Sequence, residues 1–487
     1  MSEQQNANET VSIIKRRDLN EETPVESAVV AVDVEQKLTD IFKLTIDCFE
    51  EVFDFLSLRD LVAVGQTCKR MQRIAGHCFQ LNYASEEAHI REDGLYIGND
   101  KIDCFNNASQ KIRILYDLIT GFYGFMTEDD KERFASLNQM MHFLISTSLK
   151  HLTSIQGFAV IGLHVNQEDQ SEIDRLDRLK EFMSKVENVT LSSSDENVVD
   201  ALLPHCSNMK CLCLWDTISF RNEYEWMHRI YPMLDYLILA NGGDVPEAIP
   251  AFKTFLELNT TIKKLEVNAE LFWKNRALFK SLNIKYDTLV INYDFYKDKF
   301  ESFSHFLNEL HELEFYRKLS FISNSKFSQE HIYRLASVKG LVKFDDTTHT
   351  RLETNKINVG YLRNLEELKI GYSAFITDLK SLPHILSKLQ RIYFLAVISD
   401  DILPFICHAK KLNKIKFERL MSGSYFDEET NILDLFELNK MREKLVGACK
   451  ITIYVEEDVY LATKWAVKQI EFNLIEIKRS TSYDWLN

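Results

Sequence analysis

The sequence predicts an α/β fold, a solenoid of short parallel strands with outer helices, preceded by a small three-helix module. Three observations predict it. Apolar residues recur about every 25 residues between positions 161 and 415. Helix-like segments lie between these apolar positions. A separate group of amphipathic helical segments occupies residues 44–75.

Each repeat has an apolar residue at every third position, twice, and then an alternating apolar pair. Residues 362–370 (LRNLEELKI), 386–394 (LSKLQRIYF) and 409–417 (AKKLNKIKF) show this pattern. The spacing is that of leucine-rich repeats, in which each unit runs strand, loop, helix. The phase is ambiguous near Leu341. The third apolar positions are Ile161, Val189, Leu212, Leu237, Leu265, Leu289, Leu319, Leu341, Leu368, Ile392 and Ile415.

Four regions follow from these patterns. Residues 1–37 are polar and acidic and predict a disordered tail. Residues 38–80 form the helical module, and residues 81–110 a linker or N-terminal cap. Residues 111–487 form the leucine-rich-repeat solenoid, which we expect to end in an irregular repeat near Ile451 and Ile453 with a polar cap behind it.

Composition limits the possible functions. The formal net charge of −15 argues against general nucleic-acid binding, because phosphate recognition needs excess Lys and Arg. The 9 cysteines are scattered, as expected in a reducing compartment. The N-terminus lacks a signal-peptide pattern, and charges interrupt every apolar stretch, so no membrane partner is expected. We expect a cytoplasmic and/or nuclear protein.

The helical module has one predicted apolar stripe and three short helices. Asp60 and Thr67 are expected to cap the second and third helices, and Gly65 to end the second. Three short helices bury little surface alone, so the module should need a partner. The stripe consists of Phe49, Val52, Phe53 and Leu56.

Residues 40–80 resemble the F-box family. Its pattern runs Leu-Pro, a hydrophobic pair, Ile-Phe-x-Tyr-Leu, Asp-Leu, and Cys-Lys before an aromatic residue. Thr45 replaces the usual proline, and Met71 stands where an aromatic residue is common. The matching residues are Leu44, Asp47, Cys48, Phe49, Val52, Phe53, Phe55, Leu56, Asp60, Leu61, Cys68 and Lys69.

The resemblance implies a non-catalytic subunit that docks on the Skp-family adaptor of a cullin–RING ubiquitin ligase and presents a protein substrate through its repeats. Two alternatives remain, an F-box scaffold with a non-degradative task and a plain repeat-type binding module. The residues that the resemblance assigns to adaptor binding are Leu44, Ile46, Phe49, Val52, Phe53, Leu56 and Leu61.

The residues between the repeat leucines should line an exposed concave sheet. In the late repeats these residues are basic with interleaved tyrosines, which favours an acidic or phosphorylated partner segment. Ordinary solvated strand faces are the alternative. The candidate substrate-binding residues are Trp215, Tyr236, Lys369, Arg391, Tyr393, Lys414 and Lys416.

The sequence carries no recognisable catalytic or metal-binding motif. His205, Cys206, Cys211 and Cys213 crowd into nine residues. The repeat phase places Cys206 in the core and alternates Cys211 and Cys213 with buried leucines, so their thiols should not converge on a metal. We therefore predict no enzyme, no cofactor and no metal site.

Overall fold

The computed structural model describes residues 44–65, 67–83, 88–91, 94–97, 100–102, 123–126, 155–161, 183–192, 199–200, 202–215, 224–240, 250–293, 299–323, 327–346, 357–373, 376–421, 432–467 and 472–480. The chain divides into two compact units, Met1–Phe53 and Asp54–Asn487. The predicted disordered tail, residues 1–37, lies outside the described residues. None of the described helices is both long and apolar enough to cross a membrane.

The elements of the two units have the following bounds. The first unit holds α2 (Ile46–Phe53). The helices of the second are α3 (Leu58–Gly65), α4 (Lys69–Tyr83), η2 (Leu203–His205), η3 (Glu225–His228), α9 (Pro250–Leu258), α10 (Ala269–Lys274), α11 (Arg276–Ser281), α12 (Phe300–Glu312), α13 (Gln329–Leu335), η5 (Val359–Tyr361), η7 (Leu379–Ser381), α14 (Leu382–Ile385), α15 (Ser399–His408), α16 (Leu435–Glu443) and α17 (Glu457–Val467). Its strands are β1 (Ala88–Arg91), β2 (Gly94–Ile97), β3 (Asp100–Ile102), β4 (Tyr123–Met126), β5 (Ile155–Ile161), β6 (Val186–Ser192), β7 (Cys211–Trp215), β8 (Tyr236–Ala240), β9 (Lys264–Asn268), β10 (Tyr286–Tyr293), β11 (Tyr316–Ser323), β12 (Leu341–Asp346), β13 (Glu367–Tyr372), β14 (Arg391–Ile398), β15 (Lys414–Met421), β16 (Ile451–Val455) and β17 (Ile475–Arg479).

Thr45 begins α2. Its hydroxyl oxygen accepts a hydrogen bond from the backbone N–H of Cys48 at 3.4 Å, the bond that an N-cap residue makes to the first turn of a helix. Thr45 stands where the F-box pattern has proline. A capping hydroxyl thus stands at the start of α2 in the sequence position of the proline.

Ser57 and Cys68 begin α3 and α4. The Ser57 hydroxyl accepts from the backbone N–H of Asp60 at 3.2 Å and donates to the Asp60 carboxylate at 2.8 Å. The Cys68 sulfur accepts from the backbone N–H of Met71 at 3.5 Å. The caps predicted at Asp60 and Thr67 are therefore wrong, because Asp60 is already in the first turn of α3 and Thr67 lies one residue before the cap of α4. The predicted helix end at Gly65 is confirmed.

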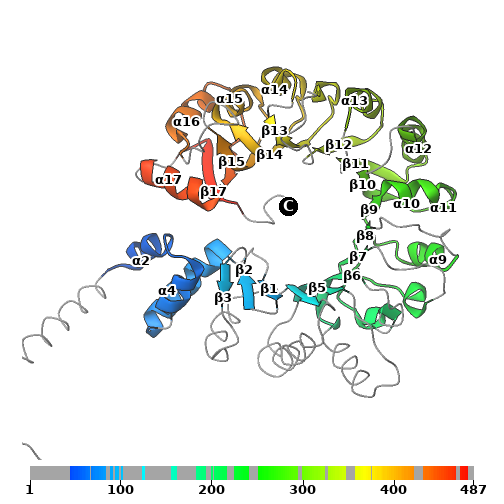
Figure 1. The fold of residues 1–487 in the computed structure, drawn as a ribbon, viewed down its shortest axis with the longest axis horizontal. Helices are drawn as coiled ribbons and strands as arrows, with labels where there is room; N and C mark the ends of the chain where they lie inside the picture. The colour runs from blue at the N-terminus through cyan, green and yellow to red at the C-terminus, as the bar shows by residue number, and fades with distance from the viewer. Residues whose placement is uncertain are drawn as a thin grey trace, which may run out of the picture. The chain divides into compact units, whose positions relative to one another are not determined.

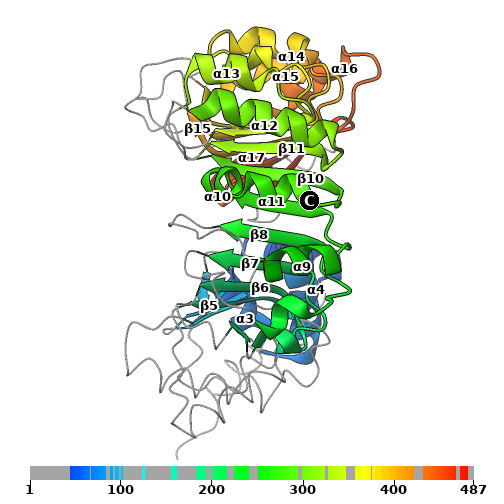
Figure 2. The same cartoon turned by 90° about the vertical axis from the view of Figure 1, so that its right-hand side faces the viewer.

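The described strands form one continuous sheet within the second unit. β3, β2 and β1 pair antiparallel in that order, and β1 pairs parallel with β4. From β4 to β17, each strand pairs parallel with the next along the chain. Helices α9 to α16 lie on one side of these strands (Figure 1), and β5 to β8 stack in chain order (Figure 2). This is a solenoid-like α/β arrangement, as predicted.

The third apolar positions of the repeats form two buried rows across the strands. The first row contains Val189, Leu212, Leu237, Leu265, Leu289 and Leu319, and the second contains Leu368, Ile392 and Ile415. Their predicted register is confirmed. The position predicted at Ile161 is wrong, since Phe158 pairs with Val189 and Ile161 pairs with Ser192.

A change of register at β12 separates the two rows. Leu319 pairs with Leu341, but the next residue, Ser320, pairs with Lys343, so Val342 is an extra residue in the ladder. Phe344 then stands opposite Leu368. The ambiguous phase near Leu341 has this origin, because β12 enters the sheet in one phase and leaves it in another.

The sheet continues beyond the repeat that was expected to be the last. Ile453 of β16 pairs with Ile415 of β15, and Ile477 of β17 pairs with Ile453. Helix α17 connects these last two strands. The polar cap predicted behind Ile453 is therefore wrong, because Ile475 and Ile477 are buried and supply another apolar pair to the core.

Aromatic side chains fill the core around β10 to β12. The rings of Tyr293 and Phe300 lie 5.1 Å apart, and those of Phe321 and Phe327 lie 5.6 Å apart. The buried ring of His331 packs 4.9 Å from both Phe300 and Phe327. The core of these repeats therefore uses phenylalanine and tyrosine as well as leucine and isoleucine.

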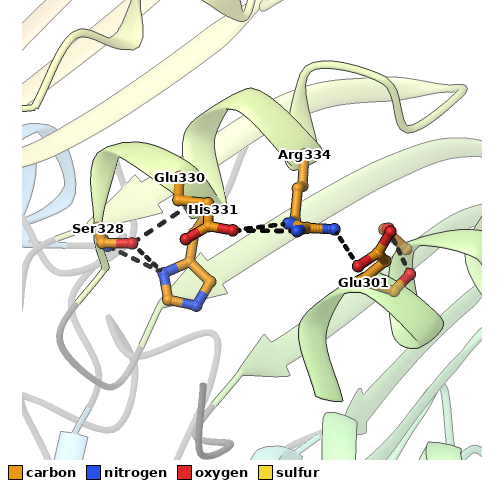
Figure 3. Close-up of polar contacts among 6 residues, drawn as sticks. Glu301, Ser328, Glu330, His331 and Arg334 are labelled. Carbon is orange, nitrogen blue, oxygen red and sulfur yellow. Dashed lines mark hydrogen bonds and ion pairs between the residues drawn. The ribbon is translucent and has the colours of Figure 1, made fainter. Parts of the chain in front are cut away.

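Helix α13 is fixed at its start and to its neighbour. The backbone N–H of His331 donates to the Ser328 hydroxyl, and the backbone N–H of Ser328 donates to Nδ1 of His331 at 3.0 Å (Figure 3). One turn later, Arg334 forms ion pairs with Glu330 at 3.0 Å and with Glu301 of α12 at 2.6 Å. The reciprocal bonds start the helix, and Arg334 joins it to the preceding repeat.

Candidate functional site

Helix α2 presents apolar side chains on its surface. Ile46 and Val52 are each 54% exposed, and Leu44, just before the helix, is 41% exposed. In the same unit, Phe49 and Phe53 are buried, with their rings 5.8 Å apart. Exposed aliphatic groups are a common feature of helices that bind an apolar groove on a partner.

The predicted apolar stripe of the helical module therefore has two parts. Phe49 and Phe53 are core residues, Leu56 is partly buried, and Val52 faces outward. Each residue turns a helix by about 100°, so Val52 lies about 100° from Phe53 around α2. The prediction of a single stripe is wrong at Val52. Leu61 of α3 is 2% exposed and also belongs to the core.

The seven adaptor residues implied by the F-box resemblance thus differ in exposure. Leu44, Ile46 and Val52 are exposed, Leu56 is partly buried, and Phe49, Phe53 and Leu61 are buried. Helical spacing alone could not separate exposed from buried residues, because exposed Ile46 and Val52 each lie three positions from buried Phe49.

Phe55 is a further exposed apolar residue that the assigned set omits. Its ring lies 5.1 Å from that of Trp465 on α17, and both side chains remain well exposed. Next to it, the Asp54 carbonyl accepts a hydrogen bond from the Arg479 guanidinium. The start of the second unit thus contacts its last repeat. No periodic signal in the sequence pairs residues this far apart.

The structure brings together most of the predicted substrate-binding residues. Lys369, Tyr393 and Lys416 stand opposite one another on β13, β14 and β15, and Arg391 stands opposite Lys414. Tyr236 is remote, on β8. Trp215 ends β7, and its side chain lies outside the described residues.

Carboxylates neutralise much of this strand face. Lys369 pairs with Asp345 at 3.1 Å, and Arg391 lies 3.9 Å from Glu367. Lys416 is only 8% exposed. Lys414 lies 5.9 Å from the ring of Tyr454. Acidic residues on the preceding strands therefore pair with two of the four late-strand cations, Lys369 and Arg391.

Tyrosine hydroxyls join the same network. The Tyr393 hydroxyl donates to the Glu418 carboxylate, and the Tyr236 hydroxyl donates to Glu266. The Lys264 ammonium lies 3.8 Å from the centre of the Tyr236 ring. Burial, together with the neighbouring carboxylates, raises the pKa of both tyrosines. They stay protonated and can act as hydrogen-bond donors across the physiological pH range.

The crowded cysteines do not form a metal site. Cys206 is buried, and its thiol donates to the Leu202 carbonyl at 3.6 Å. Burial raises the pKa of Cys206 to about 12, and it also raises the pKa of Cys211. Throughout the part of the chain that the structure describes, no three His, Cys, Asp or Glu side chains are arranged to hold a metal ion.

Comparison with known proteins adds one match. The chain matches none of the curated proteins with which it was compared. Residues 41–78 match the family model of the F-box domain, over the range that holds α2, α3 and most of α4. The chain therefore contains an F-box domain, and this domain supports a role in binding the adaptor of an SCF-type ubiquitin ligase.

Proposed function

We propose that this chain is the substrate-recognition subunit of an SCF-type ubiquitin ligase. Its F-box binds the Skp-family adaptor of a cullin–RING ligase, and its leucine-rich-repeat solenoid holds the protein to be ubiquitinated. The F-box domain at residues 41–78 is the observation that carries this proposal. F-box proteins are typically non-catalytic, so the chain contributes binding surfaces to the reaction.

The parallel sheet supports the second half of the proposal. Its buried rows recur with the period expected of leucine-rich repeats, and consecutive repeats pair with one another. Stacked repeats of this kind expose a long row of strand faces and turns. Such a surface can bind a segment of another protein while a separate domain binds the adaptor.

The exposed side of α2 is the proposed adaptor contact. Ile46 and Val52 would each move from water into an apolar groove, and burying such a side chain contributes about 1.5–3 kcal/mol. A carboxylate at either position would stay unpaired in that groove, which costs several kcal/mol. These two residues are therefore the most direct test of adaptor binding.

We expect the double variant Ile46→Asp and Val52→Asp to lose binding to the purified Skp-family adaptor. Both side chains are more than half exposed, so the thermal unfolding midpoint of the variant should stay close to that of the parent. Calorimetric titration of adaptor into the full chain measures the affinity. A reconstituted ligase then reports whether a captured substrate is ubiquitinated.

Ile230→Asp with Met233→Asp is the matched control. These residues are 64% and 51% exposed, and both lie in the second unit, just before β8. This control should bind the adaptor like the parent. Full adaptor binding by the folded α2 variant would contradict the proposed function, as would equal loss in both variants.

A further inference from the structure

The turns that precede the strands change in charge along the array. Those before β8 and β9 expose the uncharged pairs Pro232-Met233 and Thr260-Thr261. In the middle of the array, the turn before β12 carries a cation that forms an ion pair. Lys339, before β12, lies 2.8 Å from Glu312. Apart from Lys263 before β9, the early and middle turns therefore carry little uncompensated positive charge.

The turns before β13, β14 and β15 are different. They carry four exposed basic residues, which we name the turn-edge cations: Arg363, Lys388, Lys410 and Lys411. The Lys388 ammonium donates to the amide oxygen of Asn364 in the preceding turn at 3.0 Å. Within the described ranges, none of the four forms an ion pair with a carboxylate. This contrasts with Lys369 and Arg391 on the strand face.

Backbone hydrogen bonds hold these turns at a regular spacing. The N–H of Gln390 donates to the Glu366 carbonyl at 2.8 Å, and the N–H of Asn413 donates to the Gln390 carbonyl at 2.9 Å. Neighbouring parallel strands lie about 4.8 Å apart. The turn-edge cations therefore form a row with a fixed backbone and flexible side-chain ends.

Stabilisation of helix ends does not account for Lys410 and Lys411. Cations near a helix C-terminus often compensate its exposed carbonyls. At the end of α15 this task belongs to Arg442, which donates to the carbonyls of Ile406 at 3.0 Å and of Ala409 at 2.9 Å. It also donates to the Lys410 and Leu412 carbonyls. The side chains of Lys410 and Lys411 are therefore not needed to compensate the end of α15.

We propose that the turn-edge cations bind an extended acidic segment of a partner protein, running across the turns before β13, β14 and β15. The inference rests on the proposed function only in identifying that partner as the substrate. The acidic-partner site then lies at the turn edge, where the cations lack carboxylate partners among the described residues, and not on the strand face, where Asp345 and Glu367 already pair with Lys369 and Arg391.

An extended chain fits this row. It advances about 3.4 Å per residue, so every second side chain points the same way at intervals of about 7 Å. This interval is longer than the spacing of about 4.8 Å between neighbouring strands, and lysine and arginine side chains are long enough to bridge the difference. Carboxylates and phosphates satisfy the same cations, and Arg363 can hold either through two parallel hydrogen bonds. The chain's net charge of −15 would repel such a segment from most other surfaces.

The test uses the full-length chain and a fluorescein-labelled peptide of alternating Glu and Ser, followed by fluorescence anisotropy. Arg363→Glu with Lys411→Glu should weaken binding at least about tenfold. Lys263→Glu with Lys299→Glu is the matched control, because it changes the net charge equally at exposed lysines without ion pairs among the described residues. The control should bind within about twofold of the parent.

Two further peptides and one nucleic acid identify the ligand. A Gln and Ser peptide should not bind, and added salt should weaken the acidic peptide. Tighter binding of a phosphoserine version would identify phosphate as the preferred anion, and equal binding would identify carboxylate. The inference is overturned if the parent binds neither anionic peptide, if both double variants weaken equally, or if oligothymidylate binds more tightly. Adaptor titration of the same samples shows separately whether the proposed function holds.

Discussion

Arg442 is a fully buried cation whose guanidinium is hydrogen-bonded to backbone carbonyl groups. Its guanidinium donates to carbonyls of Ile406, Ala409, Lys410, Leu412 and Cys449. Burial lowers the pKa of Arg442, but an arginine keeps its proton after such a shift. The planar guanidinium suits this arrangement because its N–H groups point outward in fixed directions. The Arg442 side chain thereby links α16 by hydrogen bonds to the end of α15 and to the turn before β15.

Arg442→Met should destabilise the protein by several kcal/mol. The apolar side chain fills part of the volume but leaves the carbonyls without donors, and each buried unsatisfied group costs about 1–3 kcal/mol. Urea unfolding measures the loss. Arg363→Met is the control, because Arg363 is exposed and its replacement should change stability by under about 0.5 kcal/mol. Equal stability of the two variants would contradict the role of Arg442.

Cys206 should resist alkylation in the folded protein. Its pKa is raised to about 12 by burial, so at pH 9 it remains a thiol while an ordinary cysteine is substantially ionised. Iodoacetamide at pH 9 should modify the exposed Cys449 and spare Cys206 until urea unfolds the chain. Mass spectrometry of the peptides measures both. Labelling of Cys206 at the rate of Cys449 would show that the thiol is not buried.

The same shift gives Cys206 a pH-dependent contribution to stability. The folded pKa is raised, so the folded state binds more protons than the unfolded state above pH 9. The contribution is fully present below pH 9 and declines as the pH rises toward about 12. Cys206→Ala should remove this part of the decline, as seen in the difference between urea unfolding curves of variant and parent.

At the scale of the element, the buried rows make the strands interdependent. Leu368 is fully buried in β13, between Phe344 and Ile392 on the neighbouring strands. Leu368→Asp should cost several kcal/mol, because it places an unpaired carboxylate in the core. The damage should spread to adjacent repeats, because each repeat is stabilised mainly by its neighbours.

Thermal unfolding, with hydrogen exchange of the β12 and β14 amides, tests the Leu368 prediction. The control is Asn364→Asp, which adds a carboxylate at an exposed position of the same repeat. A Leu368→Asp chain that melts like this control would mean that the register at β13 is wrong.

Periodicity predicted the strands where one phase continues along the chain. Leu237, Leu265 and Leu289 illustrate this, since each pairs with the next as expected. It failed at Ile161 and behind Ile453, where a change in phase or a longer interval removes the regular spacing. A local sequence pattern contains no information about which other strand a given strand will pair with.

The charge of the strand face was predicted less well than its position. Lys369 and Arg391 were identified on the exposed side of the strands, but their partners Asp345 and Glu367 lie one repeat earlier. Reading the charges one repeat apart, as cross-strand pairs, would have shown this neutralisation. Exposure on α2 could not be predicted in the same way, because buried Phe49 and exposed Val52 are both large apolar residues three positions apart.

At the scale of the whole molecule, the two proposed binding functions belong to different parts of the sequence. The F-box domain lies near the N-terminal end of the sequence, and the turn-edge cations belong to repeats about 300 residues later. Arg363→Glu with Lys411→Glu leaves Ile46 and Val52 unchanged. We therefore expect this variant to keep its adaptor affinity, and this independence distinguishes partner selection from assembly with the ligase.

Strand β17 has a consequence for how the chain behaves at high concentration. Among the described strands, β17 pairs with β16 alone. It carries Glu476, Lys478 and Arg479; Lys450 engages Glu476 at 3.0 Å, and Arg479 pairs with Glu457 at 2.8 Å. Charges on an edge strand disfavour the addition of a further chain, because the incoming strand would have to desolvate them. We therefore expect the charges of β17 to disfavour cross-β aggregation at this strand.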